Sequence, residues 1–553
     1  MKPSLIKLIE DSIRQNWDLK ALTDFNGETL QYKDVARKIE KLHLMMEAAG
    51  IRPGDKIALC GRNSSNWCVA FLATLTYGAV IVPILHEFKP DNIHNIVNHS
   101  EARLLFVGDQ VWENLNENSM PALEGILCLR DFTLTACRSD DLDYARRHLN
   151  ELFGRKYPKL FTVDDVGYPA ESSEEEVAVI NYTSGTTGFS KGVMLPYRSL
   201  LSNILFCRSK MKLRQGDNMV SMLPMGHVFG MTADFLYGIT QGAHLFFLTR
   251  MPSPKIIINA VAQVHPRIIA CVPLVIEKIV KKEILPRIDN KIGKLLLRLP
   301  IINEKIKERV REESIRLFGE NLQEIVVGGA SFNAEVEAFL RKIKFPCVNG
   351  YGMTECGPFI CYSPWEESAY TSCGRAADRM EVRVISPDPQ RIPGELICRG
   401  TNNMLGYYKN PEATAQVIDK DGWLHTGDMA VISESGHVYI KGRCKNMLLS
   451  SSGQNIYPEE IEAKLNNMPF VNESLVVMSR EKLVALVYPD FDEALRNGFD
   501  EKKLAELLDQ SRTDLNRELP AYSQLTRIVL QSEEFEKTAK KSIKRYLYQQ
   551  TDI

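Results

Sequence analysis

The stretch EVAVINYTSGTTGFSKGVMLPYRSL, residues 176–200, decides the fold class of this chain. Its first part, EVAVINYT, is a run of apolar and β-branched residues typical of a buried strand. Glycines let the backbone that follows turn tightly and present N–H groups, and such a loop cradles phosphate oxygens. The stretch therefore predicts a phosphate-binding loop carried by a buried strand. Its residues are Thr183, Ser184, Gly185, Thr186, Thr187, Gly188 and Lys191.

This loop differs from the G-x-x-x-x-G-K-[ST] loop of P-loop kinases and GTPases. Ser190 stands where the second glycine of that pattern belongs, and Gly192 follows the lysine. An ordinary P-loop enzyme is therefore disfavoured. The simpler alternative is a polar surface loop, which short Gly/Ser/Thr runs usually form. We favour phosphate binding because an unbroken run of small polar residues on a buried strand is followed by a lysine.

Strand-like runs alternate with helical patterns through the first 440 residues. The alternation predicts an α/β fold, a large N-terminal domain of βαβ units whose sheets are covered on both faces. Helices are expected at Tyr32–Ala49 and Asn333–Lys344. The expected strands are KIALC (56–60), RLLFVGD (103–109), EVAVINYT (176–183), HLFFLT (244–249), RIIACVP (267–273) and EIVVGGA (324–330).

The sequence pattern changes after about residue 380. Short strand-like runs separated by Gly and Pro there predict an antiparallel β subdomain. We place a boundary near 444, which gives domains 1–444 and 445–553, the second a small α/β unit on a hinge. Its segment IYPEEIEAKL puts Pro458 at a helix start. Glu459, Glu460 and Glu462 are expected in the first turn, where the helix dipole favours acids. ESLVVMS and KLVALVYP then predict a strand pair.

Composition excludes several classes of protein. The chain has 553 residues, 44% of them hydrophobic, and its 68 basic and 70 acidic residues give a net charge of −2. This balance argues against a chain-wide nucleic-acid surface. The 12 cysteines are scattered singly, which favours free thiols in a reducing cytoplasm. The uncharged run WCVAFLATLTYGAVIVPIL (67–85) is long enough to cross a membrane, but its Tyr77-Gly78 interruption favours a buried helix, a turn and a buried strand.

Residues 275–317 are rich in lysine and arginine and have a helical pattern broken by Pro286 and Pro300. A basic amphipathic helix can lie on an anionic membrane, so peripheral contact with the inner face of a membrane is one interpretation. A solvated helical face is the more common one. The pattern leaves both open, and it does not predict an oligomeric state.

Three further clusters carry chemistry. Asn349–Glu355 (NGYGMTE) offers Tyr351 to stack on a base, Thr354 to bond a phosphate and Glu355 as an oxygen ligand for Mg²⁺. WLHTGD ends at Asp428, a carboxylate that can accept both hydroxyls of a ribose. The third, KGRCK (441–445), lies at the change in composition.

Together, and in this order, these residues resemble the adenylate-forming superfamily of acyl-CoA synthetases, firefly-type luciferases and peptide-synthetase adenylation domains. The resemblance runs from the helix near residue 32 to the end of the chain. Within it, the basic segment and VPLVIEKI (272–279) look most like long-chain fatty-acid–CoA ligases. The motifs that carry the resemblance are YTSGTTGFSKGVM, LPMGHVFG, VNGYGMTE, ICRGTNNMLGYYKNPEAT, DGWLHTGD, IKGRCKNM and SSGQNIYPEEIE.

The resemblance implies a role for each matching residue. The loop from Thr183 to Lys191 would hold the β- and γ-phosphates of ATP. Thr354 would contact the α-phosphate, Glu355 would ligate Mg²⁺, and Asp428 with Arg443 would bind the ribose. The remaining residues would surround adenine, acid or coenzyme A, or act as the hinge: Gly328, Gly329, Ala330 and Tyr351 at the base or carboxylate, His227, Phe229 and Gly230 at the acyl pocket, Gly453 at the pantetheine tunnel, and Lys445 at the hinge.

One departure from the family pattern concerns the last motif. The family has a lysine that bridges the carboxylate and the α-phosphate, placed four residues after a threonine and just before Ile-x-Arg. Alignment on Thr538 and on Ile543-x-Arg545 puts the uncharged Ser542 at that position. We hypothesise that Lys540 or Lys541 takes over, because a lysine side chain is long and flexible.

The resemblance implies an enzyme that uses ATP and Mg²⁺ to activate a medium- or long-chain fatty acid and then transfers the acyl group to coenzyme A. Its expected partners are these small molecules, with no nucleic acid. One alternative is a ligase that loads an acyl-carrier-protein thiol. Another is a nucleotide- or acyl-binding homologue with impaired adenylation, because of Ser542. An amino-acid-activating domain is disfavoured, since the acyl-site stretch offers only Asp234 as an anion.

Overall fold

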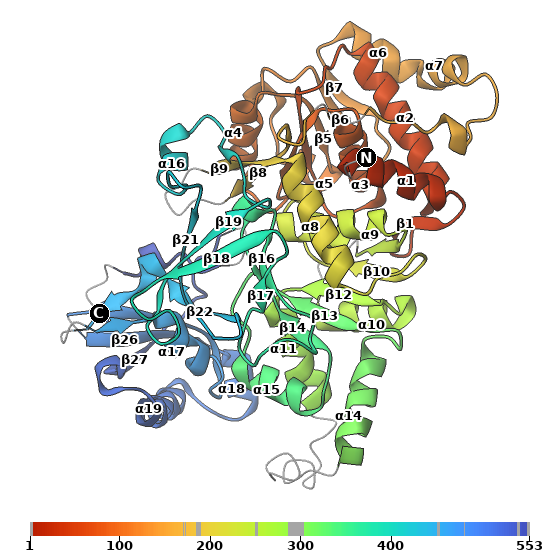
Figure 1. The fold of residues 1–553 in the computed structure, drawn as a ribbon. Helices are drawn as coiled ribbons and strands as arrows, with labels where there is room; N and C mark the ends of the chain where they lie inside the picture. The colour runs from red at the N-terminus through yellow and green to blue at the C-terminus, as the bar shows by residue number, and fades with distance from the viewer. Residues whose placement is uncertain are drawn as a thin grey trace. The chain divides into compact units, whose positions relative to one another are not determined.

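The computed structural model describes residues 4–169, 171, 173–183, 190–248, 253–285, 304–450, 454–480, 482–538 and 542–549. The chain divides into two compact units (Figure 1). Unit 1 consists of Met1–Glu381 and Cys398–Leu424, and unit 2 of Val382–Ile397 and His425–Ile553. The mixed α/β fold with a large and a small part is the one expected from the sequence. The functional boundary near 444 stays a prediction about which part of the chain moves.

The first large sheet of unit 1 has eight strands and carries much of the stretch 176–200 in two of them. Its inner strands β8, β4, β3, β5 and β6 run parallel. In spatial order the strands are β20 (Gly406–Tyr407), β9 (Lys191–Pro196), β8 (Val177–Thr183), β4 (Val80–Ile84), β3 (Lys56–Cys60), β5 (Ala102–Val107), β6 (Gly125–Cys128) and β7 (Leu134–Cys137).

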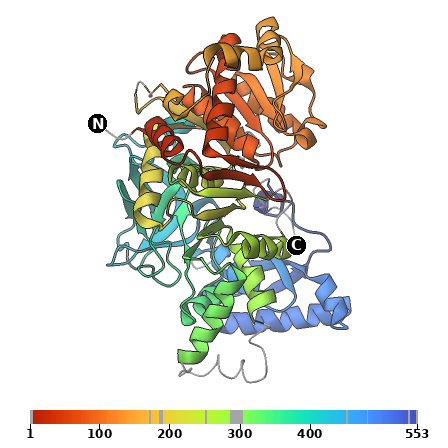
Figure 2. The same cartoon turned by 90° about the vertical axis from the view of Figure 1, so that its right-hand side faces the viewer.

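Helices pack on this sheet, as the alternation of patterns predicted. In Figure 1, α1, α2 and α3 lie together near the N-terminus, and Figure 2 shows the same red and orange segment as a layered α/β body. Ser64 caps α3 by accepting from the backbone N–H of Trp67. The helices of the first 160 residues are α1 (Leu5–Gln15), α2 (Tyr32–Ala48), α3 (Ser65–Thr76), α4 (Pro90–Ser100), α5 (Asp109–Trp112), α6 (Asp140–Arg147) and α7 (Leu149–Lys156).

The uncharged run 67–85 is core, as predicted. It forms α3, a turn at Gly78 with φ of 84°, and the fully buried strand β4. Trp67 and Phe71 stack in the interior with ring centroids 5.5 Å apart. Among the described residues, no helix is both long and apolar enough to span a membrane.

The second large sheet of unit 1 has seven strands, six of them parallel. A buried cluster that includes Val220, Ile269, Ile325 and Phe345 packs on it. The strands in spatial order are β14 (Cys347–Asn349), β13 (Glu324–Val327), β12 (Ile268–Cys271), β10 (Asn218–Ser221), β11 (His244–Phe247), β1 (Lys20–Asp24) and β2 (Thr29–Gln31). Associated helices are α8 (Tyr197–Lys210), the π-helix η3 (Gly230–Leu236), α9 (Tyr237–Thr240), α10 (Pro254–Val264), α11 (Pro273–Ile279) and α15 (Ala334–Lys342).

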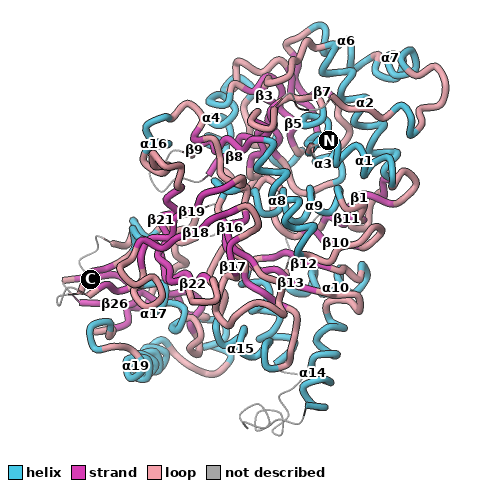
Figure 3. Tube along the Cα trace, in the orientation of Figure 1, coloured by secondary structure: helices cyan, strands magenta, loops and turns pink. Residues whose placement is uncertain are grey.

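A small sheet follows, made of β15 (Tyr351–Gly352), β16 (Phe359–Tyr362) and β17 (Arg375–Ala376), and α16 (Pro411–Ala415) lies further along the chain. The basic stretch 275–317 is helical where it is described, in α11, the π-helix η4 (Val280–Ile284) and α14 (Glu304–Leu317). Pro286 and Pro300 lie outside the described residues. Figure 3 shows α14 as a cyan helix, and its Val310, Ile315 and Leu317 pack against the buried cluster of the seven-stranded sheet.

Unit 2 contains antiparallel strands of the predicted β subdomain and the predicted small α/β unit. β21 (Leu424–Ile432) and β22 (Val438–Arg443) pair antiparallel, in a sheet with β18 (Met380–Ile385) and β19 (Gly394–Gly400). β25 (Val471–Ser479) and β26 (Lys482–Pro489) form the predicted strand pair, and β27 (Arg527–Leu530) adds to β26 in parallel. The other elements are β23 (Leu448–Leu449), β24 (Asn455–Ile456), α17 (Pro458–Leu465), α18 (Phe491–Arg496) and α19 (Glu501–Glu518).

Strand periodicity gives the β25–β27 sheet two buried faces. Val476 packs in a cluster with Leu465 and Leu508 of the helices. Its neighbours Leu475 and Val477 point to the opposite face, where Phe535 of the C-terminal tail covers them. The tail is therefore the second layer of this unit.

One detail of the sequence prediction is wrong. Pro458 starts α17, and Glu459 and Glu460 occupy the first turn as expected, but Glu462 lies beyond it. The side chain of Glu462 is buried, and its Oε1 accepts from the backbone N–H of Val476 at 2.7 Å. This acid serves packing against β25 rather than the helix dipole.

Candidate functional site

The predicted phosphate loop begins and ends on a β-hairpin. Thr183, the last residue of β8, pairs with Lys191, the first residue of β9. Two residues earlier on β8, the buried Asn181 donates to the carbonyl of Gly226 at 3.0 Å. The hairpin is thus joined to the loop that carries the acyl-site motif. Five of the loop residues lie outside the described part of the chain: Ser184, Gly185, Thr186, Thr187 and Gly188.

The structure brings Lys191 to the same tyrosine as the predicted Mg²⁺ ligand Glu355. Glu355 lies with Thr354 in a short 3-10 helix, Thr354–Cys356, and both side chains are buried. Tyr407 of β20 donates from its hydroxyl to Glu355 Oε1 at 2.8 Å. Lys191 Nζ lies 4.7 Å from the centroid of the same ring. Tyr407 lies in the motif ICRGTNNMLGYYKNPEAT. No role was predicted for it, because the motif does not indicate which residues Tyr407 contacts.

The carboxyl edge of the seven-stranded sheet collects Gly328, Gly350 and Phe229. Gly328 follows β13 and donates from its N–H to Cys271 O at 3.2 Å, and Gly350 follows β14 and donates to Val327 O at 2.8 Å. A Cβ on Gly328 would lie 3.2 Å from the Phe229 ring, so the two approach closely. Crevices at the carboxyl ends of parallel strands are where open α/β sheets bind ligands.

Four other predicted site residues lie next to these three in the sequence. Gly329 has a φ of 85°, which favours glycine, and Ala330 comes next. Tyr351 starts β15 and pairs with Cys361. A Cβ on Gly230 would lie 2.6 Å from the carbonyl of Pro224, so only glycine fits there.

The acyl-site loop 221–229 is fixed by side chains that the sequence prediction did not include. Asn63 donates to Leu223 O at 2.7 Å and accepts from the N–H of Met225 at 2.9 Å. His227, the predicted gate, accepts at Nδ1 from the N–H of Phe229 at 3.2 Å. Asparagines outside any motif give no signal in one sequence, so only the fold reveals this role.

Asp234 belongs to the support of this loop. Its Oδ2 accepts from the backbone N–H groups of Met222 and Leu223, both at 3.2 Å. The side chain is fully buried, and burial raises the pKa of its carboxyl to about 8. A carboxyl that is buried and bonded to the loop is a poor partner for a substrate ammonium, which agrees with disfavouring amino-acid activation.

In unit 2, strand register brings Asp428 and Arg443 together. They are direct partners in the β21–β22 pair, and Arg443 Nε lies 2.8 Å from Asp428 Oδ1. Asp428 is buried, whereas the Arg443 side chain is 60% exposed. Lys445, the predicted hinge, is exposed in the 3-10 helix Cys444–Asn446 just beyond. Gly453 lies outside the described residues.

The C-terminal tail carries Ser542 beside Thr538. The N–H of Thr538 donates to Ser542 O at 2.8 Å, and Lys537 and Ile543 form a β-bridge. Lys544 pairs with Glu536 within the tail. Lys540 and Lys541, the proposed substitutes for the missing lysine, lie outside the described residues.

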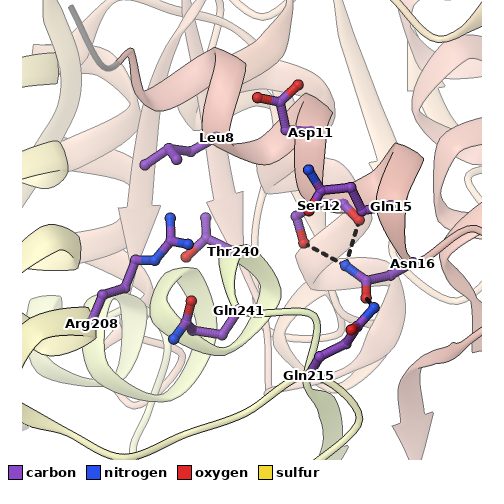
Figure 4. Close-up of a pocket in the computed structure, with 9 residues that line it drawn as sticks. All are labelled: Leu8, Asp11, Ser12, Gln15, Asn16, Arg208, Gln215, Thr240 and Gln241. Atoms are coloured by element: carbon purple, nitrogen blue, oxygen red, sulfur yellow. Dashed lines mark hydrogen bonds between the residues drawn. The ribbon is translucent and has the colours of Figure 1, made fainter.

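A polar cavity of about 330 Å³ lies elsewhere in unit 1 (Figure 4). None of the predicted site residues lines it. Its buried Asn16 donates to Ser12 O at 2.7 Å and accepts from Gln215 at 2.7 Å, so these polar groups serve one another. The described residues contain no group of three or more His, Cys, Asp or Glu that could hold a metal ion. A Mg²⁺ ion needs only one or two protein carboxylates when substrate phosphates supply the rest.

The chain is similar over most of its length to known CoA ligases. A long-chain-fatty-acid–CoA ligase of Escherichia coli O157:H7 is 26% identical over 501 residues, covering 86% of this chain and 82% of that protein. A 4-coumarate–CoA ligase of Narcissus pseudonarcissus is 26% identical over 490 residues, covering 85% and 80%. The crystal structure of ATP-bound MatB from Rhodopseudomonas palustris superposes with a TM-score of 0.74 at 20% identity, covering 97% and 98%.

Two family profiles match consecutive parts of the chain. The profile of the AMP-binding enzymes matches residues 9–408, which include the β8–β9 hairpin, Glu355 and Tyr407. The profile of their C-terminal domain matches residues 445–551. The chain belongs to the AMP-binding enzyme family of the adenylate-forming superfamily.

Proposed function

We propose that this protein is an ATP-dependent ligase that converts a medium- or long-chain fatty acid to its acyl-adenylate and transfers the acyl group to coenzyme A. The observation that carries the proposal is the meeting of Lys191 and Glu355 at Tyr407. An ammonium and a metal-binding carboxylate, held beside a hairpin with a glycine-rich loop, suit the phosphates of ATP. Relatives named as CoA ligases support the choice of coenzyme A as acceptor.

The chemistry requires positioning rather than a protein nucleophile. A carboxylate is a poor electrophile, and adenylation gives it AMP as a good leaving group for attack by a thiol. Two anions must first approach each other, so charge neutralisation and orientation dominate. In this proposal the loop from Thr183 to Lys191 holds the β- and γ-phosphates, Thr354 contacts the α-phosphate, and Asp428 with Arg443 binds the ribose.

The residues present fit a Mg²⁺ ion. Glu355 supplies a hard oxygen ligand, and its Oε1 is oriented by the hydrogen bond from Tyr407. The bound ion would supply neutralisation of the phosphate charge. Glu355 would hold it together with the phosphates themselves.

The proposal assigns motion to the second domain. Residues 445–553 would rotate about Lys445 between the two half-reactions, and Gly453 would then approach the pantetheine of coenzyme A. Lys540 or Lys541 would supply the cation for adenylation that Ser542 cannot. Contact of the basic stretch 275–317 with an anionic membrane, from the cytoplasmic side, completes the proposal.

The test is a panel of carboxylate-dependent ATP–pyrophosphate exchange assays, with fatty acids from C2 to C18 and with 4-coumarate. The panel is repeated with coenzyme A to detect the thioester. We expect exchange and thioester formation with medium- or long-chain acids. A preference for 4-coumarate would overturn the choice of fatty acid and leave the ligase chemistry in place.

Two further outcomes identify the alternatives. Exchange without thioester formation on coenzyme A, together with transfer to an acyl-carrier-protein thiol, would assign the carrier-protein ligase. No exchange with any acid, together with measurable binding of ATP, would assign the adenylation-impaired homologue. Ser542 is the feature that favours this last alternative.

A further inference from the structure

Tyr407 contacts both charged groups of the proposed ATP site through different parts of one side chain. Its hydroxyl donates to Glu355 Oε1 at 2.8 Å, and its ring lies under Lys191 Nζ at 4.7 Å. The tyrosine is 6% exposed and Glu355 is 9% exposed, so the hydrogen bond between them is shielded from water, whereas Lys191 is half-buried. Tyr407 is thus an uncharged partner of both groups, and its contacts leave their charges available to a ligand.

The backbone fixes where this ring lies. Met404 donates from its N–H to Glu355 O at 2.8 Å, which ties the start of the segment to the 3-10 helix. Leu405 donates to Met194 O at 3.0 Å and Tyr408 to Gly192 O at 2.7 Å, which ties it to β9, the strand that begins at Lys191. The segment 404–408 therefore joins the two parts of the chain whose side chains Tyr407 contacts.

We propose that Tyr407 is a positioning residue that sets the orientation of Glu355 for Mg²⁺ and of Lys191 for the phosphates of ATP. A hydrogen bond to one carboxylate oxygen fixes the rotation of the group and leaves the other oxygen for a ligand. A cation–π contact holds an ammonium in place while its charge stays available. The inference rests on the proposed function and adds a residue to it.

Two substitutions separate the two contacts. Tyr407→Phe removes the hydroxyl and keeps the ring under Lys191, whereas Tyr407→Leu removes both. The probe is ATP without any carboxylic acid, so that no turnover occurs, and the readout is the upward shift of the melting temperature as MgCl₂ is titrated at fixed ATP. We expect Tyr407→Phe to raise the Mg²⁺ concentration for half of the shift by about tenfold, as loss of a hydrogen bond to a charged group predicts.

Tyr407→Leu is expected to weaken ATP binding further, by roughly threefold to tenfold at saturating Mg²⁺, because the cation–π contact is also lost. The matched control is Tyr408→Phe. Tyr408 is the next residue in the chain, and its hydroxyl bonds Glu101 Oε2 at 3.1 Å instead of Glu355. Its removal is expected to leave both Mg²⁺ and ATP dependence unchanged.

A double variant distinguishes positioning from a general structural effect. If Tyr407 acts on the metal through Glu355, Tyr407→Phe has no further effect on Mg²⁺ dependence in a Glu355→Gln background. Additive effects would overturn the inference, as would a Tyr407→Phe variant that melts earlier without ligand but keeps the wild-type Mg²⁺ dependence. Failure of wild-type protein to be stabilised by ATP and Mg²⁺ would instead contradict the proposed function itself.

Discussion

At the scale of single residues, Asp428 is the side chain that we propose for binding the ribose of ATP. It is buried on β21, and its neighbour across the strand pair, Arg443, contacts Oδ1 while most of the guanidinium side chain remains exposed. A carboxylate paired with a guanidinium is a strong hydrogen-bond acceptor. This is the property that binding of a ribose requires.

We predict that Asp428→Asn raises the KM for ATP by roughly tenfold to a hundredfold with a smaller effect on kcat. The reason is that hydrogen bonds to a charged group contribute about 1.5–3 kcal/mol, and an amide offers only one accepting oxygen. ATP–pyrophosphate exchange at varied ATP measures the effect. Asp421→Asn, at an exposed turn seven positions earlier, is the control and should behave as wild type. An unchanged KM in Asp428→Asn would remove this residue from the nucleotide site.

At the scale of elements, the described residues of the C-terminal tail, up to Thr538 and from Ser542 onward, are fixed by contacts within unit 2. Lys537 Nζ lies 2.6 Å from Glu473 Oε1 of β25, and Phe535 packs among Leu475 and Val477. Arg545 pairs with the buried Glu462 of α17. The described residues on both sides of 539–541 are therefore held on the sheet and on α17 at several points.

Because the residues on both sides of Lys540 and Lys541 are held, the proposed role of these two lysines can be tested by substitution. We predict that Lys540→Ala/Lys541→Ala lowers fatty-acid-dependent ATP–pyrophosphate exchange by at least about tenfold, since a charge that bridges two anions is lost. The control is Lys502→Ala/Lys503→Ala, which removes two exposed positive charges from α19 in the same domain. A wild-type rate of ATP–pyrophosphate exchange in Lys540→Ala/Lys541→Ala would show that neither lysine replaces the one missing at Ser542.

The Arg545–Glu462 pair gives a prediction about stability. Burial raises the pKa of Glu462 to about 7, and Arg545 opposes this rise. Removing the arginine leaves a buried acid without its cation, so we expect Arg545→Met to lower the free energy of unfolding by roughly 2–4 kcal/mol. The measurement is denaturation by urea near neutral pH.

Two controls belong to that experiment. Arg517→Met breaks an exposed pair with Asp514 on α19 and should cost under about 1 kcal/mol. Adding Glu462→Gln to Arg545→Met should recover part of the loss, because the uncompensated charge is gone. No recovery would mean that packing of the arginine, and not the buried charge, stabilises the tail.

Elements were predictable from the sequence to the extent that local patterns determine them. The run KIALC matches β3 at both ends, and the buried segment around Gly78 forms the predicted helix, turn and strand. Glu462 was misplaced because, with Pro458 as the first helical residue, it is the fifth residue of α17 and lies past the first turn. Its pairing with Arg545 could not be predicted, because that partner lies 83 residues away in the sequence. No role was predicted for Tyr407 for the same reason, since its strand β20 pairs with β9, which lies far earlier in the sequence. Local periodicity carries no information on such distant pairing.

At the scale of the whole molecule, buried acids make the stability of unit 1 depend on pH. Glu324 at the start of β13 accepts from the Tyr362 hydroxyl and, at 2.7 Å, from the N–H of Trp365. Burial raises its pKa to about 7 even so, with Glu366 adding to the rise and Lys212 opposing it. Asp234 is raised further, to about 8. Both acids favour the protonated form in the folded chain.

The sign of the effect follows from proton binding. Between the ordinary pKa of a glutamic acid and about 7, the folded chain holds a proton on Glu324 that the unfolded chain has lost. Its stabilising contribution is thus fully present below the ordinary pKa and is lost as the pH rises to about 7. We predict that Glu324→Gln, which cannot ionise, reduces the fall in melting temperature between pH 5 and about 7. Glu335→Gln, an exposed acid at the start of α15, should leave the profile unchanged, and an unaltered slope in Glu324→Gln would contradict the assignment.

The short strand β20 also has a consequence for how the protein is made. Pro196 ends β9 and Gly406 begins its partner, so about 210 residues separate the two strands. At about 5–20 residues per second, a ribosome needs roughly 10 to 40 s to span that gap. Throughout this interval β9 is an outer strand of the nascent sheet, with backbone groups open to a neighbouring chain. We therefore expect products truncated before residue 404 to aggregate, and chaperone protection to matter most in the middle of translation.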